Sequence, residues 1–136
     1  MGDKVRQPTA REVAMRFLEA YWAGDLERAL AACAPGAMIE LPPSVPLRSP
    51  APISEVLPTI FASVYPRFIG RRFDIRIDRC IPDETAVVIE YTATGRLTNG
   101  RHFECRYLVV VEVEGDGVRL FRPYTDTKYV AAELLS

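Results

Sequence analysis

The chain has 136 residues, a length that suits one domain around a single hydrophobic core. Apolar residues make up 49% of it and charged residues 26%, which is ordinary for a globular protein. The formal net charge is −1 and the two signs are mixed along the chain. We therefore expect neither nucleic acid nor an anionic membrane surface as a partner.

The N-terminus reads "MGDKVRQPTARE", which is polar and does not resemble a signal peptide. No apolar run approaches the roughly 20 residues that are needed to cross a bilayer. The sequence therefore predicts a cytoplasmic protein that is not associated with a membrane.

The cysteines Cys33, Cys80 and Cys105 are far apart, and the chain has one histidine, His102. No CxxC pair is present, so a structural zinc site is not expected. Each cysteine lies in or beside an apolar run and is interpreted as a buried free thiol. We expect no metal and no cofactor.

The first half of the chain predicts helices. Residues 1–8 are expected to be a flexible lead and residues 9–136 a single domain. "TARE" is a capping box that begins a helix at Thr9, and Gly24 ends this helix. Asp25 is a cap for a second helix over residues 26–34.

A strand is predicted over residues 37–41, followed by "PPSVPLRSPAP", which has five prolines in eleven residues. This segment cannot be a central strand or a helix interior. Loops of this kind lie over the surface, often at the mouth of a pocket. A third helix is predicted over residues 53–65.

The second half predicts strands. Residues 71–81 alternate between apolar and charged side chains. Two long strands, 85–97 and 102–114, are joined at "TNG", and "GDG" leads into a strand over residues 118–126. A short helix closes the chain. Helices followed by an antiparallel meander define an α+β fold.

The last strand ends in three polar residues spaced by two, Arg122, Tyr124 and Asp126. This spacing places their side chains on one face. Two interpretations stay open. The three residues converge in a pocket, or they form a solvated strand end in which Asp126 caps the terminal helix.

Three features together resemble the nuclear transport factor two-like superfamily, in its SnoaL-like (polyketide cyclase-like) branch. They are "FLEAYWAGDLERALAACAPGAMIELP", the long hairpins with "GDGVRLF", and the ending "RPYTD". The resemblance covers about residues 9–135. It implies a cone-shaped, curved antiparallel sheet wrapped around N-terminal helices (a cystatin-like α+β roll). It also implies a deep, mainly apolar pocket and a homodimer formed through the outer sheet face.

The resemblance also bears on catalysis. Ketosteroid isomerases of this fold need an aspartate and a tyrosine at the positions of Leu41 and Phe17, which cannot move or donate a proton. The epoxide hydrolase network matches Arg122 and Asp126 but lacks a second aspartate. SnoaL-like cyclases carry an acidic residue at the end of the last strand, which implies that Asp126 is the proton-handling residue.

Further candidate ligand contacts are less specific. Tyr124 can hydrogen-bond a carbonyl group or fill core volume, and Trp22 lies at the pocket mouth or in the core. Tyr91 and Tyr107 share apolar strand faces, so each is a ligand contact, a core residue or part of a dimer surface. Glu40 is either a second acid in the pocket or exposed to solvent.

Three functions remain open. The first is cofactor-free acid–base catalysis on a small apolar, carbonyl-bearing molecule (of the cyclase, isomerase or hydrolase type), with Asp126 as the proton-handling residue. The second is a binding module for such a molecule. The third is a dimerisation or docking protein, because residues 108–113, "LVVVEV", are largely apolar on both faces and need cover on both sides.

Overall fold

The computed structural model describes residues 7–135, so most of the lead that we expected over residues 1–8 lies outside the described residues. The fold is α+β, as predicted. Its elements are α1 Ala10–Trp22, α2 Leu26–Ala31, β1 Cys33–Ile39, β2 Ala51–Pro52, α3 Ile53–Val64, η1 Tyr65–Arg67, η2 Ile69–Arg71, β3 Asp74–Pro82, β4 Ala86–Arg96, β5 His102–Glu114, β6 Gly117–Thr125 and α4 Thr127–Leu134.

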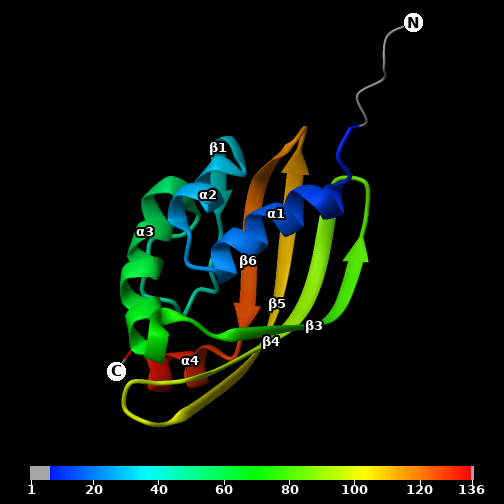
Figure 1. Cartoon of the computed structure of the whole chain (residues 1–136). Helices are drawn as coiled ribbons and strands as arrows, with labels where there is room; N and C mark the ends of the chain where they lie inside the picture. Colours follow the sequence, from blue (N-terminus) through cyan, green and yellow to red (C-terminus); the bar gives the residue numbers. More distant parts are fainter. Residues whose placement is uncertain (1–6, 136) are drawn as a thin grey trace, which may run out of the picture.

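The strands form one curved sheet in the order β2-β1-β6-β5-β4-β3 (Figure 1). The run from β3 to β6 is the antiparallel meander that the sequence predicts. The sheet is nevertheless mixed, because β1 pairs in parallel with β6. Parallel pairing needs a long connection, and β2, α3 and the strands β3 to β5 all lie between β1 and β6 in the chain. The sheet is open, with β2 and β3 at its edges.

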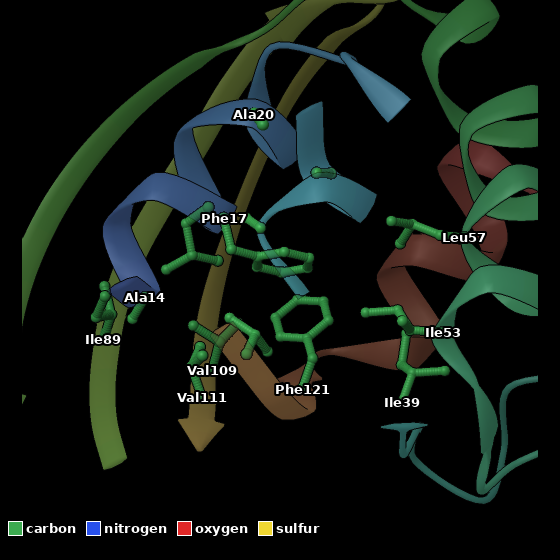
Figure 2. Close-up of a cluster of buried hydrophobic side chains, with 14 of the residues drawn as sticks. Ala14, Phe17, Ala20, Ile39, Ile53, Leu57, Ile89, Val109, Val111 and Phe121 are labelled. Atoms are coloured by element: carbon green, nitrogen blue, oxygen red, sulfur yellow. The ribbon is translucent and has the colours of Figure 1, made fainter. Parts of the chain in front are cut away.

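The core lies between α1 and the sheet face that α1 covers (Figures 1 and 2). The capping box predicted for α1 is present, with Thr9 Oγ1 accepting from the Glu12 backbone N–H at 3.1 Å. The ring of Phe17 meets Phe121 edge-on at 5.0 Å. Figure 2 shows buried side chains from α1, α3 and four strands in this core: Ala14, Phe17, Ala20, Ile39, Ile53, Leu57, Ile89, Val109, Val111 and Phe121.

The chain leaves α2 earlier than the sequence predicts. The helix ends at Ala31, and β1 begins at Cys33, within the predicted helix. The Val118 N–H donates to the Ala32 carbonyl oxygen at 2.9 Å, and Cys33 pairs with Val118. A Cβ at Gly117 would lie 2.6 Å from the Ala34 backbone nitrogen. Pairing with a distant strand therefore overrides the local helical preference.

A β-bulge interrupts β3. Its pairing with β4 shifts register between Ile77 and Arg79, which leaves Asp78 as the extra residue. The Asp78 carboxylate accepts hydrogen bonds from Arg76 Nε at 2.7 Å and from Thr92 Oγ1 at 2.7 Å. The bulge explains why the clean alternation predicted over residues 71–81 does not continue through the strand.

Residues 41–50, here called the strap, leave the sheet between β1 and β2. Ser49 ties the base of the strap by accepting from the Leu41 N–H at 2.6 Å and donating to the Leu41 carbonyl oxygen at 3.5 Å. The Ser44 hydroxyl donates to Thr127 Oγ1 at 3.0 Å. The strap is therefore fixed at its base and meets α4 near its tip.

None of the helices within residues 7–135 combines the length and the apolar character needed to cross a membrane. Within the same range, no group of three or more histidine, cysteine or acidic side chains is arranged to hold a metal ion.

Candidate functional site: a cavity lined with tyrosines

A cavity of about 380 Å³ lies between the inner sheet face, the strap, α3 and α4. This volume is in the range of small-molecule sites. The lining residues are mainly apolar or aromatic: Tyr21, Leu41, Pro42, Ser44, Val45, Pro46, Leu47, Thr59, Ile60, Ser63, Val64, Tyr65, Phe68, Phe73, Tyr91, Ala93, Phe103, Tyr107, Pro123, Thr125, Thr127, Val130, Ala131, Leu134 and Leu135.

The exposed lining residues belong to the strap, to α3 and to α4 with the following Leu135, and they include Ser44, Ser63 and Ala131. The lining residues of the sheet are buried or half-buried, and Tyr91 and Ala93 are among the buried ones. The mouth of the cavity therefore lies among the strap, α3 and α4, and the sheet forms its deep wall. This outcome agrees with the prediction that the proline-rich loop lies at a pocket mouth.

A row of three hydroxyl-bearing residues crosses the deep wall. Tyr91 on β4 pairs with Tyr107 on β5, which pairs with Thr125 on β6, so all three side chains share the inner face. The rings of Tyr91 and Tyr107 stack with centroids 5.0 Å apart and planes inclined by 8°. Two residues along β4, on the same face, the small side chain of Ala93 pairs with Cys105 and also lines the cavity.

The tyrosine hydroxyls have two kinds of environment. Tyr65 donates to the backbone carbonyl oxygen of Tyr21. No hydrogen bond of ordinary length and angle reaches the hydroxyls of Tyr21, Tyr91 or Tyr107 from residues 7–135, and these phenol oxygens are not sealed off from open space. Trp22 makes a looser polar contact with Tyr91. Cys105 makes a similar polar contact with Tyr107. None of the three phenols donates a hydrogen bond of ordinary geometry, so each can donate to a ligand in the cavity.

Burial keeps these phenols protonated. Desolvation raises the pKa of Tyr21 from 10.0 to about 12. Desolvation, with a smaller contribution from neighbouring phenols, raises the pKa values of Tyr65, Tyr91 and Tyr107 well above the ordinary value. At neutral pH all four side chains can donate a hydrogen bond, and none can act as a general base.

The cavity wall carries no aspartate, glutamate, histidine, lysine or arginine among the described residues. Asp126, the predicted proton-handling residue, is exposed and accepts from the Tyr129 N–H at 3.1 Å, so it is the N-cap of α4. Its neighbours Thr125 and Thr127 line the cavity, but Asp126 does not. The capping interpretation is thus confirmed, and a catalytic role for Asp126 stays a prediction.

The predicted contacts Arg122, Tyr124 and Glu40 also do not line the cavity. Arg122 pairs with Val110 and Tyr124 with Leu108, on the sheet face that points away from it. Arg122 Nε lies 3.3 Å from Glu40 Oε2. The spacing by two correctly placed Arg122 and Tyr124 on one face, but the cavity is on the other side of β6, where Pro123 and Thr125 lie.

Tyr91 and Tyr107 are the two predicted ligand contacts that line the cavity. Trp22 does not line the cavity, but its ring lies 4.9 Å from that of Tyr91. Its buried Nε1 makes no hydrogen bond of ordinary length and angle within residues 7–135. Leu41 lines the cavity and Phe17 is buried in the core, so neither position brings a proton-transferring group.

Sequence reasoning missed Tyr21 and Tyr65 as lining residues. Tyr21 follows Phe17 by four residues on α1, which is the spacing of a core-facing row, and nothing local separates core from cavity. Tyr65 lies in the short 3-10 helix after α3. A Cβ at Gly24, where φ is +71°, would lie 3.0 Å from the Tyr65 ring. The glycine that ends α1 therefore also admits this tyrosine.

A family model for the SnoaL-like domain matches residues 14–121. The chain therefore belongs to the SnoaL-like family, as the sequence features indicated. A search of curated proteins finds no significant match.

Solved structures confirm the fold. A protein assigned to the SnoaL-like polyketide cyclases of Jannaschia sp. CCS1 has a TM-score of 0.73 at 14% identity, covering 97% of both chains. An NTF2-like protein of Burkholderia thailandensis E264 has a TM-score of 0.70 at 19% identity, covering 93% of this chain and 97% of that chain. A protein with a ketosteroid isomerase-like fold from Catenulispora acidiphila DSM 44928, in complex with trimethylamine, has a TM-score of 0.70 at 13% identity. The match covers 93% of this chain and 94% of that chain.

Proposed function

We propose that this protein binds a small, mainly apolar molecule that carries a carbonyl oxygen. One observation carries the proposal. Tyr21, Tyr91 and Tyr107 line an otherwise mainly apolar cavity, and no residue from 7 to 135 accepts from their hydroxyls in ordinary geometry. Poorly satisfied donors at a desolvated wall are costly, and a ligand acceptor would relieve this cost.

Family membership supports a small-molecule site of this kind. The chain is a SnoaL-like protein, and one structural neighbour is assigned to the polyketide cyclases of this family. Another neighbour was solved in complex with a small molecule, trimethylamine. The mainly apolar wall of the present cavity fits the carbon skeleton of a ligand, and the phenols fit its oxygen.

Binding without proton transfer is the form of the proposal that the geometry favours. The phenols with raised pKa values act as donors, and the wall supplies no carboxylate or imidazole. Catalysis is the second candidate, because Asp126 lies between two lining residues, Thr125 and Thr127. For that function the Asp126 carboxylate would have to leave the Tyr129 N–H and turn toward the ligand.

A matched pair of ligands tests the proposal. 1-Tetralone and tetralin share a two-ring skeleton and differ in one carbonyl group. The chain has a single tryptophan, and Trp22 contacts Tyr91, so its fluorescence reports events at the deep wall. We expect both to bind, with 1-tetralone about fivefold tighter because one net hydrogen bond contributes ~1 kcal/mol. Absence of binding by both compounds, or equal affinities, would contradict the proposal.

A further inference from the structure

We propose that the cavity selects its ligand by charge state, so that a titratable ligand binds in its neutral form and its anion is rejected. This inference rests on the proposed function and narrows the class of ligand. The inference depends on a property of the lining residues taken together: among the described residues, none of them carries a formally charged side chain.

The first argument is the composition of the wall. Each element contributes neutral groups: phenols come from Tyr21, Tyr65, Tyr91 and Tyr107, and hydroxyls come from the strap, α3, β6 and α4. The hydroxyl-bearing lining residues are Ser44, Thr59, Ser63, Thr125 and Thr127. A charged ligand atom would lose its hydration and gain no opposite charge in return.

The second argument is that nearby charges are already engaged outside the cavity. Asp126 caps α4, and Arg122 lies 3.3 Å from Glu40 and 3.8 Å from Glu112 on the outer face. The turn between β4 and β5 is joined to α4 by an ion pair of 2.7 Å between Arg101 and Glu133. None of these side chains lines the cavity, so none is placed to neutralise a ligand there.

The third argument comes from the tyrosines themselves. The pKa of each phenol shows whether its surroundings stabilise or destabilise a negative charge. Burial raises the pKa of Tyr21 to about 12, and the pKa values of Tyr91 and Tyr107 are also raised. The thiol of Cys105, which makes a polar contact with Tyr107, has a raised pKa for the same reason. A ligand hydroxyl placed beside them meets the same environment.

The opposing effect is hydrogen bonding. Phenol donors can stabilise an oxyanion when they converge on it, and Tyr91 and Tyr107 stand side by side. Because burial raises the pKa values of the four phenols, their ionisation does not contribute between pH 6 and pH 9. A change of ligand affinity that follows the pKa of the free ligand over this range therefore originates in the ligand. The sign of that change therefore decides whether the uncharged wall or the phenol pair dominates.

The test uses 7-hydroxycoumarin, which titrates near neutral pH and whose neutral and anionic forms differ in excitation spectrum. If only the neutral form binds, the dissociation constant rises about tenfold per pH unit above the pKa of the free compound, and the bound compound keeps the neutral spectrum. Tighter binding with rising pH, or an anionic spectrum in the complex, overturns the inference and leaves the proposed function standing.

A second pair of probes has a fixed charge. N-phenyl-1-naphthylamine is neutral, and 8-anilinonaphthalene-1-sulfonate carries the same rings with a permanent negative charge. We expect the neutral compound to bind at least about tenfold tighter. Equal affinities for the neutral and the charged compound overturn the inference about charge and leave the proposed function standing. If none of the probes binds, both the inference and the proposed function are overturned.

The place of binding is checked with two variants that fill space without adding charge. Ala93→Leu fills space at the deep wall. Ala131→Leu fills space at the mouth, and because Ala131 is exposed this variant should still fold. We expect either change to weaken binding of the neutral probes at least about fivefold. Unchanged binding in both variants would place the probes outside the cavity and overturn the inference.

Discussion

Tyr91 and Tyr107 face each other across β4 and β5, with ring centroids 5.0 Å apart and planes inclined by 8°. Cross-strand neighbours on one face are held by the ladder hydrogen bonds of both strands, so their orientation does not depend on a loop. The two phenols therefore form a rigid pair of donors at the deep wall of the cavity, while the mouth is built from the strap and helices.

Removing these hydroxyls should abolish the preference for a carbonyl group. The double variant Tyr91→Phe/Tyr107→Phe is expected to weaken the binding of 1-tetralone about fivefold and to leave the binding of tetralin unchanged, because it removes the one net hydrogen bond of ~1 kcal/mol that distinguishes the two ligands. Isothermal titration calorimetry of both ligands with the wild-type and variant proteins gives a double-mutant cycle, in which one change is the loss of the ligand carbonyl and the other is the loss of the tyrosine hydroxyls. Tyr124→Phe, on the outer face, is the matched control. A loss of equal size for tetralin would indicate altered packing instead.

Substitutions of Asp126 separate its two possible roles. Asp126→Ala should lower the free energy of unfolding by about 1 kcal/mol through loss of the cap, whereas Asp126→Asn should cost little because asparagine caps equally well. Urea denaturation measures both effects. Asparagine cannot act as a general base. If a substrate is found, abolished turnover in the stable Asp126→Asn protein would establish the catalytic role, and intact turnover would exclude it.

Alkaline pH should unfold the protein through its buried tyrosines. Burial raises the pKa of Tyr21 from 10.0 to about 12, so the unfolded chain loses this proton first. The contribution of protonated Tyr21 to the free energy of unfolding is fully present below pH 10. It is lost as the pH rises toward 12, which lowers the free energy of unfolding by about 3 kcal/mol. Urea unfolding between pH 8 and pH 11.5 measures the slope. Tyr21→Phe should flatten it, and Tyr124→Phe should not.

A homodimer through the outer sheet face is expected to bury the apolar residues that this face exposes. Leu108 and Tyr124 are adjacent there, and 36% and 46% of their surfaces are accessible. Leu108→Glu should convert a dimer into a monomer, because it places a charge at a desolvated contact. Sedimentation equilibrium gives the mass. Ile69→Glu, at an exposed residue in η2, is the control. A wild-type monomer at micromolar concentration would disprove the prediction.

The contact between the strap and α4 should control ligand exchange. Ser44 Oγ lies 3.0 Å from Thr127 Oγ1, so the two side chains are in direct contact. A disulfide between cysteines at these two positions would tie the strap to α4. We expect the oxidised Ser44→Cys/Thr127→Cys protein to release 1-tetralone more slowly than its reduced form, in stopped-flow measurements of Trp22 fluorescence. Equal release rates in the two forms would show that ligands leave by another route.

Local signals predicted much of the fold. The capping box at Thr9, the glycine that ends α1 and the long hairpins all depend on neighbouring residues, and they gave the helices and the antiparallel meander. Long-range pairing was not predictable in the same way. The early start of β1 follows from its pairing with Val118, and the bulge at Asp78 follows from contacts with Arg76 and Thr92.

The site was harder to predict than the fold. The alternation of side chains along a strand shows that Arg122 and Tyr124 share a face of the sheet, but it does not show which face lines the cavity. Both Val118 and Phe121 are buried although their positions differ in parity, since the pairing of β5 with β6 shifts register between Glu112 and Val113. The sequence pattern of β6 therefore could not identify its inner face.

The strap has a consequence for how this protein can diversify. Its base is closed by Ser49 against Leu41 and by the pairing of β1 with β2, so the sheet does not depend on the residues in between. Lengthening a loop that is tied in this way costs little free energy. Insertions and substitutions in residues 42–48 should therefore change which molecules are accepted while the tyrosine wall and the core stay intact, and directed evolution of new ligand preferences should begin there.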